Sequence, residues 1–162
     1  MTKMTYIVTD PCYILDSDTW SSICNKCKNE DFYNGTFNQL VADELTKLTG
    51  SKAYASQTGF GDWSNTLIGK VVNDGNFCAD AGMVCVCKLD SSLLTKYPMT
   101  TLKELGAIFE AEGEINVEFN TTVSDWTEIY ITDSAGNRWN SLPAMYEEED
   151  EDEYDYDEDD YE

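Results

Sequence analysis

The reactive side chains of this 162-residue sequence are six cysteines and many carboxylates, and the chain contains no histidine. Cys24 and Cys27 have the C-x-x-C spacing that zinc sites and thiol–disulfide exchange use. A zinc site would have to complete its ligands from the three later cysteines, because histidine is absent. Helical spacing explains the pair more simply, since both residues fall on one apolar stripe. We therefore predict no metal site and no cofactor.

Cys12 is the cysteine best placed to be exposed, because it follows Pro11 where an apolar run is interrupted. A nucleophilic cysteine needs an activating base, and the familiar cysteine–histidine pair is impossible in this sequence. Cys85 and Cys87 stand two apart, so in a strand they would share one face and pack as small buried hydrophobes. The sequence thus predicts no catalytic residue and favours a protein that is not an enzyme.

Two turn-rich segments could instead form a site for a small ligand. Glycine-rich loops can bring backbone N–H groups close to an anion, and aspartates at turns could hold a cation or transfer protons. The candidate residues are Asp10, Cys12, Tyr13, Gly59, Gly61 and Asp62. Tight turns with self-bonded aspartates explain the same residues more economically. A domain that binds a small ligand or nucleotide, or that is hydrolytic, is therefore our alternative interpretation.

Residues 147–162 have the most distinctive composition of the sequence, with 13 of its 32 acidic residues and no Lys or Arg. Such a segment cannot form a core and its charges repel one another, so we predict a disordered acidic tail over residues 146–162. Its tyrosines favour interaction over mere solubility, because tyrosine adds contact area and stacks on arginine. The predicted partner-binding residues are Glu147, Glu148, Glu149, Asp150, Glu151, Asp152, Glu153, Tyr154, Asp155, Tyr156, Asp157 and Tyr161.

The net charge of −22 is not confined to that tail, because the rest of the chain holds 19 acidic residues against 10 Lys and Arg. Such a surface repels nucleic acid, whose phosphates are bound mainly by Lys and Arg. It attracts a basic protein surface, with faster association at low salt. We therefore expect a basic protein as the partner and no direct binding to nucleic acid.

The apolar runs are too short to cross a membrane, and the first residues lack the features of a secretory signal. We therefore expect no membrane association and reduced thiols in a cytoplasm. With 41% hydrophobic residues the chain can still build a core. The expected organisation is one compact domain over residues 1–145, followed by the tail.

Apolar spacing predicts two or three helices. The first should have Ser17 or Asp18 as its N-cap. The second should cover residues 36–49, with Gly50 as its C-terminal stop. A third, weakened by a glycine in its middle, should start near residue 100 and extend through Ile108 and Phe109.

Strands are predicted both before and after these helices. The run over residues 6–15, which Pro11 interrupts, is typical of an edge or bulged strand. Short apolar runs at 67–72 and 82–89 predict two more.

Alternation over residues 115–120 and a second run over 126–132 predict strands with one solvent-exposed face. Turn residues at 133–137 then predict a hairpin. The expected fold is α+β, an antiparallel sheet with two or three packed helices.

Three short motifs occur in order along the first half of the chain: Asp10-Pro11-Cys12-Tyr13, Thr58-Gly59-Phe60-Gly61-Asp62 and Asp80-Ala81-Gly82. In these motifs, over roughly residues 5–90, the sequence resembles a family of small phage-encoded proteins that have no assigned activity. The resemblance implies a protein made in the cytoplasm of an infected bacterium. By analogy, such small acidic proteins act by occupying the binding surface of a host protein.

Together these features predict a non-enzymatic acidic binding protein, a phage accessory or inhibitor protein. It would occupy a basic or nucleic-acid-binding surface of a host protein, including one used in defence, as a mimic of DNA would. Besides the small-ligand domain, a structural or assembly protein of a virion is a further alternative.

Overall fold

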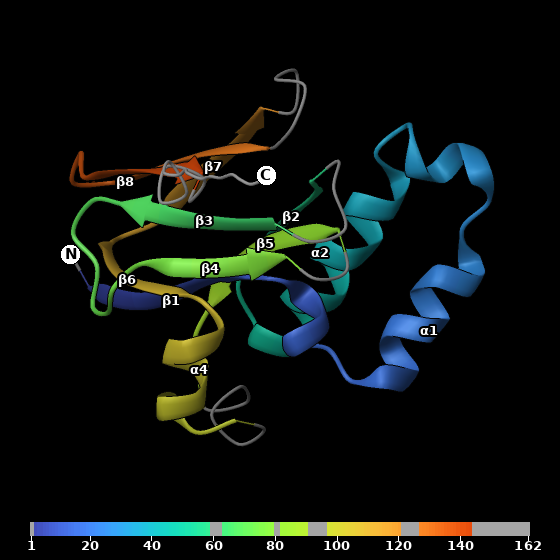
Figure 1. Cartoon of the computed structure of the whole chain (residues 1–162), viewed down its shortest axis with the longest axis horizontal. Coiled ribbons are helices and arrows are strands. Elements are labelled where there is room, and N and C mark those ends of the chain that lie inside the picture. Colours follow the sequence, from blue (N-terminus) through green and yellow to red (C-terminus); the bar gives the residue numbers. More distant parts are fainter. Residues whose placement is uncertain (1, 59–62, 80–81, 91–96, 121–126, 144–162) are drawn as a thin grey trace, which may run out of the picture.

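The computed structural model describes residues 2–58, 63–79, 82–90, 97–120 and 127–143 (Figure 1). These residues form two antiparallel sheets and three α-helices. The predicted α+β class is therefore confirmed, although the chain builds two sheets where one was expected. The predicted acidic tail lies outside the described residues.

Sheet A contains four antiparallel strands in the order β2-β5-β1-β6. Their bounds are β1 Lys3–Thr9, β2 Tyr54–Gln57, β5 Met83–Lys88 and β6 Ala107–Glu112. The predicted edge strand is wrong, because β1 is central and ends before Pro11. Proline instead starts the 3-10 helix η1, Pro11–Tyr13, at a position where its missing N–H costs no hydrogen bond.

Sheet B contains five antiparallel strands in the order β4-β3-β9-β8-β7. Their bounds are β3 Trp63–Ile68, β4 Asn76–Ala79, β7 Ile115–Asn120, β8 Glu128–Asp133 and β9 Arg138–Pro143. The strand predicted at 115–120 and the hairpin after β8 are confirmed. The strand predicted at 67–72 is wrong beyond Ile68, where β3 ends.

Two helices lie on one side of sheet A, where the second contacts the sheet and the first packs against the second. They are α1, Ser17–Lys26, and α2, Thr36–Thr49, with a short 3-10 helix η2, Asn29–Phe32, between them. The N-cap of α1 is Asp16, one residue earlier than predicted, since its carboxylate accepts a hydrogen bond from the Thr19 N–H at 2.7 Å. The predicted bounds of α2 are confirmed, and Gly50 ends it with a left-handed φ of 76°.

The third helix, α4, covers Met99–Leu105 and is shorter than predicted. Ile108 and Phe109 belong instead to β6, because the helix stops at Gly106. A Cβ atom at Gly106 would lie 2.5 Å from the Val8 carbonyl oxygen. Glycine is therefore required for the close approach of this segment to β1.

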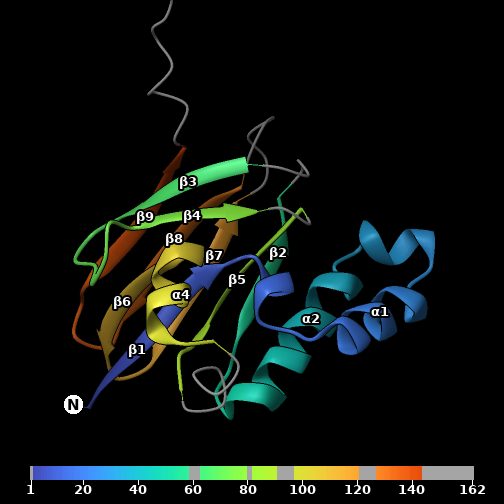
Figure 2. The same cartoon turned by 60° about the horizontal axis from the view of Figure 1, so that its bottom comes forward.

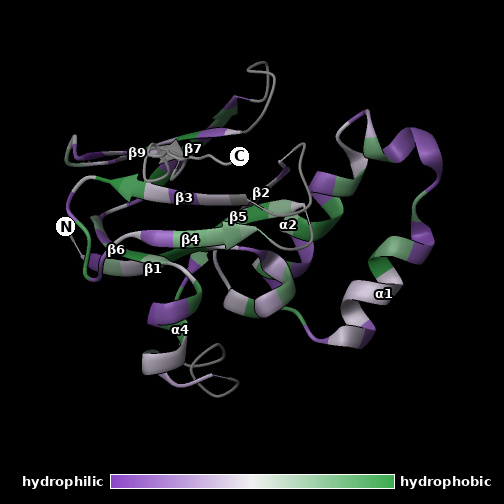
Figure 3. Cartoon of the chain, viewed as in Figure 1, coloured by the Kyte–Doolittle hydropathy of each residue, from purple (hydrophilic) through white to green (hydrophobic). Residues whose placement is uncertain are grey.

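Sheet A separates two hydrophobic cores, with the helices on one side and sheet B on the other (Figure 2). In β1, Ile7 faces the helices, whereas Tyr6 and Val8 face sheet B. Figure 3 shows β5 as hydrophobic along its length, which fits burial of both of its faces. In the inter-sheet core, the centre of the Phe109 ring lies 5.6 Å from the centre of the Tyr6 ring and 4.7 Å from the centre of the Trp139 ring.

Side chains satisfy the outer backbone groups of sheet A at both edges. At β2, the Ala53 N–H donates to Thr46 Oγ1 and the Gln57 N–H to Asn38 Oδ1, both from α2 and both at 3.0 Å. At β6, the Ile108 N–H donates to Asn73 Oδ1 at 3.1 Å. These bonds occupy groups that would otherwise template pairing with another strand.

Candidate functional site

The structure describes the first half of the predicted small-ligand site. This half consists of Asp10, Cys12 and Tyr13, which follow β1. The Asp10 side chain is fully buried, and its Oδ1 accepts a hydrogen bond from the Cys12 N–H at 2.9 Å. Asp10 therefore caps the helix η1, which is the ordinary role of an aspartate at a turn.

Gly59, Gly61 and Asp62, the second half of that site, lie outside the described residues. Thr58, immediately before them, donates its N–H to the Gly82 carbonyl at 2.9 Å, which places it beside the start of β5. Thr9, immediately before Asp10, pairs with β5 from the other side. Strand β5 thus separates the two segments where both are described.

All six cysteines are free thiols. Burial raises the pKa of Cys24, and burial with the nearby Asp31 and Cys24 raises the pKa of Cys27. Cys85 is fully buried, and burial, a hydrogen bond with Cys87 and the charge of Asp10 raise its pKa well above the ordinary value. Reactive thiols require a lowered pKa, so these three are poor nucleophiles. Within the described residues, no group of three or more Cys, Asp or Glu side chains is placed to hold a metal ion.

The outer face of sheet B is not covered by any described helix (Figure 2). Buried and solvent-exposed side chains alternate along β7 and β8, as in a sheet with one wet face. Tyr130 and Ile68 are exposed on it by 44% and 43%. The residues that share this face include Thr66, Ile68, Asn116, Glu118, Asn120, Glu128, Tyr130, Thr132, Arg138 and Asn140.

Carboxylates are held in defined positions on this outer face. The Glu128 Oε1 accepts hydrogen bonds from the Tyr130 hydroxyl at 3.0 Å and from Asn120 Nδ2 at 3.2 Å. The bond to Glu128 raises the pKa of Tyr130, and burial and the charge of Glu128 add to the rise. Glu118, which is exposed, stands opposite Tyr130 in the β7–β8 register. The face therefore combines fixed negative charge with an exposed aromatic ring.

The last strand of sheet B precedes the acidic segment in the sequence. Strand β9 ends at Pro143, at the end of the sheet where Glu128 starts β8. Three residues separate Pro143 from Glu147 in the sequence. The predicted partner-binding residues 147–157 and 161 themselves lie outside the described residues.

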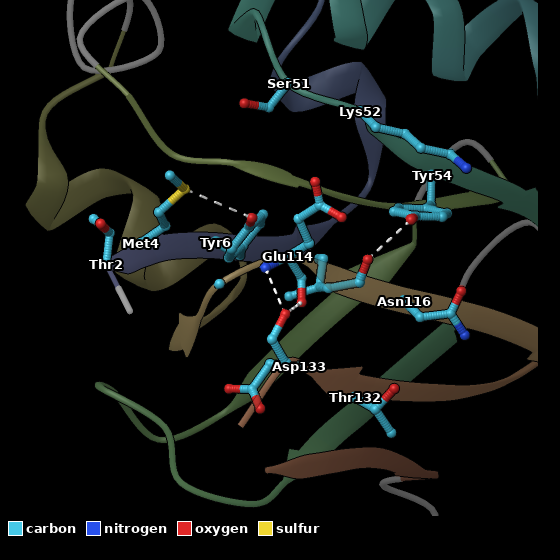
Figure 4. A pocket seen from close by; sticks show the side chains of 13 residues that line it. Thr2, Met4, Tyr6, Ser51, Lys52, Tyr54, Glu114, Asn116, Thr132 and Asp133 are labelled. Atoms are coloured by element: carbon cyan, nitrogen blue, oxygen red, sulfur yellow. Dashed lines mark hydrogen bonds between the residues drawn. The ribbon is translucent and has the colours of Figure 1, made fainter. Parts of the chain in front are cut away.

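A groove opens between β1 and β2 of sheet A and the β7–β8 edge of sheet B, with a volume of about 870 Å³ (Figure 4). Its walls come from the starts of β1, β2 and β7 and from the end of β8. The residues that line it are Thr2, Met4, Tyr6, Ser51, Lys52, Tyr54, Gly113, Glu114, Ile115, Asn116, Thr132, Asp133 and Ser134.

Two tyrosines, Tyr6 and Tyr54, and one lysine, Lys52, line this groove on the side of sheet A. The Tyr54 hydroxyl donates to the Ile115 carbonyl at 3.1 Å and so joins β2 to β7. The Lys52 ammonium lies 5.1 Å from the centre of the Tyr54 ring, within range of a cation–π contact. Tyr6 is 5% exposed, and its hydroxyl contacts only the Met4 sulfur, at 4.0 Å, among described residues. Burial, with Tyr54 and Glu114 nearby, raises the pKa of Tyr6.

Asp133 forms the floor of the groove and ties the two sheets together. Its carboxylate accepts hydrogen bonds from the Glu112 N–H at 2.8 Å, from the Ala135 N–H at 3.0 Å, and from the Asn137 N–H and side-chain amide at 2.8 and 2.9 Å. Burial alone would raise the pKa of Asp133, but these bonds, that of the Asn137 amide foremost, hold it below its ordinary value. The carboxylate is therefore ionised and its acceptor sites are occupied.

This groove was not predicted from the sequence. Its residues come from parts of the chain as distant as Tyr6, Tyr54 and Glu114, and each is unremarkable in its own segment. The turn residues from Asp133 to Asn137 are recognisable in the sequence, but they predict a hairpin and not that Asp133 lines a groove.

Comparisons with known proteins identified no relative of this chain. No family model, no curated protein and no solved structure matches the chain. In the described part of the chain, no helix is sufficiently long and apolar to span a membrane.

Proposed function

We propose that this protein is a non-enzymatic binding protein that uses its acidic surface to occupy a basic, nucleic-acid-binding surface of a host protein. It would act as a phage accessory or inhibitor protein in the host cytoplasm. The observation that carries the proposal is the uncovered outer face of sheet B, where Glu118, Glu128 and Tyr130 lie together.

The distribution of charge supports a basic partner. Outside residues 147–162 the chain still has 19 acidic residues against 10 Lys and Arg. Between described residues the structure records one ion pair, Lys47 with Glu44, so the acidic surplus is not neutralised within the fold. In the sequence, the segment richest in carboxylates begins at residue 147, four positions after the end of β9.

The small-ligand alternative receives less support. Its described carboxylate, Asp10, is buried and caps a turn, and β5 lies between Thr9 and Thr58, the described residues next to the two segments. The high pKa of Cys85 does not suit covalent chemistry.

A pull-down from bacterial lysate tests the proposal, with the full chain and a truncation after residue 146 as baits at about 50 and about 500 mM NaCl. Captured proteins are identified by mass spectrometry, and each is then tested for displacement from DNA by the purified full chain. We expect capture at low salt that weakens at high salt and on truncation, and displacement of the captured protein from DNA.

The outer face is tested with Glu118→Lys, and Glu30→Lys on η2 is the matched control for net charge. We expect roughly tenfold weaker displacement for the first variant and little change for the second, because a rim charge acts mainly on nearby partner charges. Equal loss in both variants, or capture that salt does not affect, would contradict the proposal.

A further inference from the structure

The groove between the sheets is lined by both polar and apolar groups, and among them Glu114 and the Tyr6 hydroxyl are the polar side chains that could bind a ligand. Building on the proposed function, we propose that this groove receives an arginine side chain of the basic partner. The inference rests on Tyr6, Glu114 and Asp133, which come from β1, the β6–β7 turn and β8 (Figure 4).

The charges around the groove favour a cation. Glu114 is exposed at its wall, and Asp133 is ionised at its floor. Asp133 already accepts four hydrogen bonds, so it adds negative potential rather than a ligand atom. The single lysine that lines the groove, Lys52, lies over the Tyr54 ring. Glu114 is therefore the carboxylate that can bond directly to an incoming cation.

The Tyr6 hydroxyl supplies a second acceptor for such a cation. It belongs to a side chain that is 95% buried and that lines the groove together with Glu114 (Figure 4). A thioether sulfur is a weak acceptor, so the contact with Met4 at 4.0 Å leaves the hydroxyl without a strong partner within the described fold. A buried polar group of this kind gains from a ligand that can hydrogen-bond to it.

A guanidinium fits these groups better than an ammonium. Its planar fork has five N–H donors, so it can bond to both oxygens of Glu114 and still reach the Tyr6 oxygen. It is also less strongly hydrated than an ammonium, so it leaves water for the groove more readily. Arginine is accordingly the basic residue that the groove selects.

Titration by NMR tests this assignment with three short probes: acetyl-Gly-Arg-Gly-amide, the same peptide with citrulline, and the same peptide with glutamate. Citrulline keeps the shape of arginine and removes its charge. We expect shifts of the Glu114 and Ile115 amides with the arginine probe, and binding at least about tenfold tighter than that of the citrulline probe.

Two variants locate the binding site. Glu114→Gln should weaken binding of the arginine probe about tenfold, because it removes the charge-assisted pair. Tyr6→Phe should weaken it roughly three- to tenfold while the fold is retained, since the hydroxyl makes no strong bond in the fold. Glu118→Gln is the matched control, because Glu118 lies on β7 but does not line the groove.

The outcomes separate this inference from the proposed function. Equal binding of the arginine and citrulline probes, tighter binding of the glutamate probe, or equal losses in Glu114→Gln and Glu118→Gln would overturn the arginine assignment. None of these results would affect displacement from DNA by the outer face of sheet B. Conversely, groove binding with the expected variant effects would stand even if no host protein were displaced.

Discussion

Sheets A and B contain strands of similar length, but they differ in how many of their faces are buried. Sheet A lies between the helices and sheet B, and five successive residues of β5, Met83 to Cys87, are buried. Sheet B buries one face only, so exposed and buried residues alternate along β8. The two antiparallel sheets therefore have different kinds of sequence. Packing determines the residues on both faces of sheet A, whereas sheet B has one face whose residues are free for other roles.

The difference indicates where change is tolerated. A side chain in sheet A contacts one of two cores, so nearly every substitution there alters packing. A side chain on the outer face of sheet B contacts mainly solvent and its neighbours, so its identity can be set by a partner. This is why we place the proposed recognition surface on sheet B.

Thiol reactivity gives the largest expected contrast between the sheets. Cys78 is exposed on β4, whereas Cys85 and Cys87 are fully buried in β5. Iodoacetamide labelling followed by mass spectrometry should modify Cys78 at least about 1,000-fold faster than Cys85, because Cys85 reacts only after global opening. The two rates should converge in urea. Similar rates in the native protein would mean that β5 is not buried on both faces.

Truncation of one side chain from each sheet should give the next largest contrast. Phe109→Ala removes a ring that packs on Tyr6 and Trp139, so we expect a loss of about 3–5 kcal/mol in the free energy of unfolding. Ile68→Ala, on the 43% exposed outer position of β3, should cost about 1 kcal/mol or less. Urea denaturation measures both. Comparable losses would contradict the contrast between a shared core and an uncovered face.

The sheets also differed in how well the sequence predicted them. Residues 115–120 alternate strictly, and β7 covers that range. Strand β1 was misassigned as an edge strand because Pro11 was placed within it, whereas proline marks its end. Strands β2, Tyr-Ala-Ser-Gln, and β4, Asn-Phe-Cys-Ala, have four residues each and no clear polar–apolar alternation in sequence, so tertiary pairing identifies them.

The third helix shows how a local pattern can mislead. Leu102, Leu105, Ile108 and Phe109 are spaced as on one helical face, which favoured a helix through residue 109. The contact of Gly106 with β1 decides the outcome, and that contact joins residues about a hundred positions apart. The groove was missed for the same reason, since its walls meet only when the sheets pack.

Asp133 joins the sheets, and its ionisation provides the smallest of the expected effects. Its lowered pKa means that the folded state favours the charged carboxylate. The stability that this gives is fully present above the ordinary aspartate pKa of about 3.9, and it is lost as the pH falls through the lowered value.

Asp133→Asn should therefore lower the free energy of unfolding by about 1 kcal/mol at pH 7, with the difference from the unmodified protein shrinking as the pH falls below about 4. Urea denaturation at a series of pH values measures the difference. Glu110→Gln is the control for loss of one charge, because Glu110 is exposed on β6, and its difference should stay small throughout. A difference for Asp133→Asn that is constant with pH would mean that neutral hydrogen bonds, and not the ionised carboxylate, hold the sheets together at this corner.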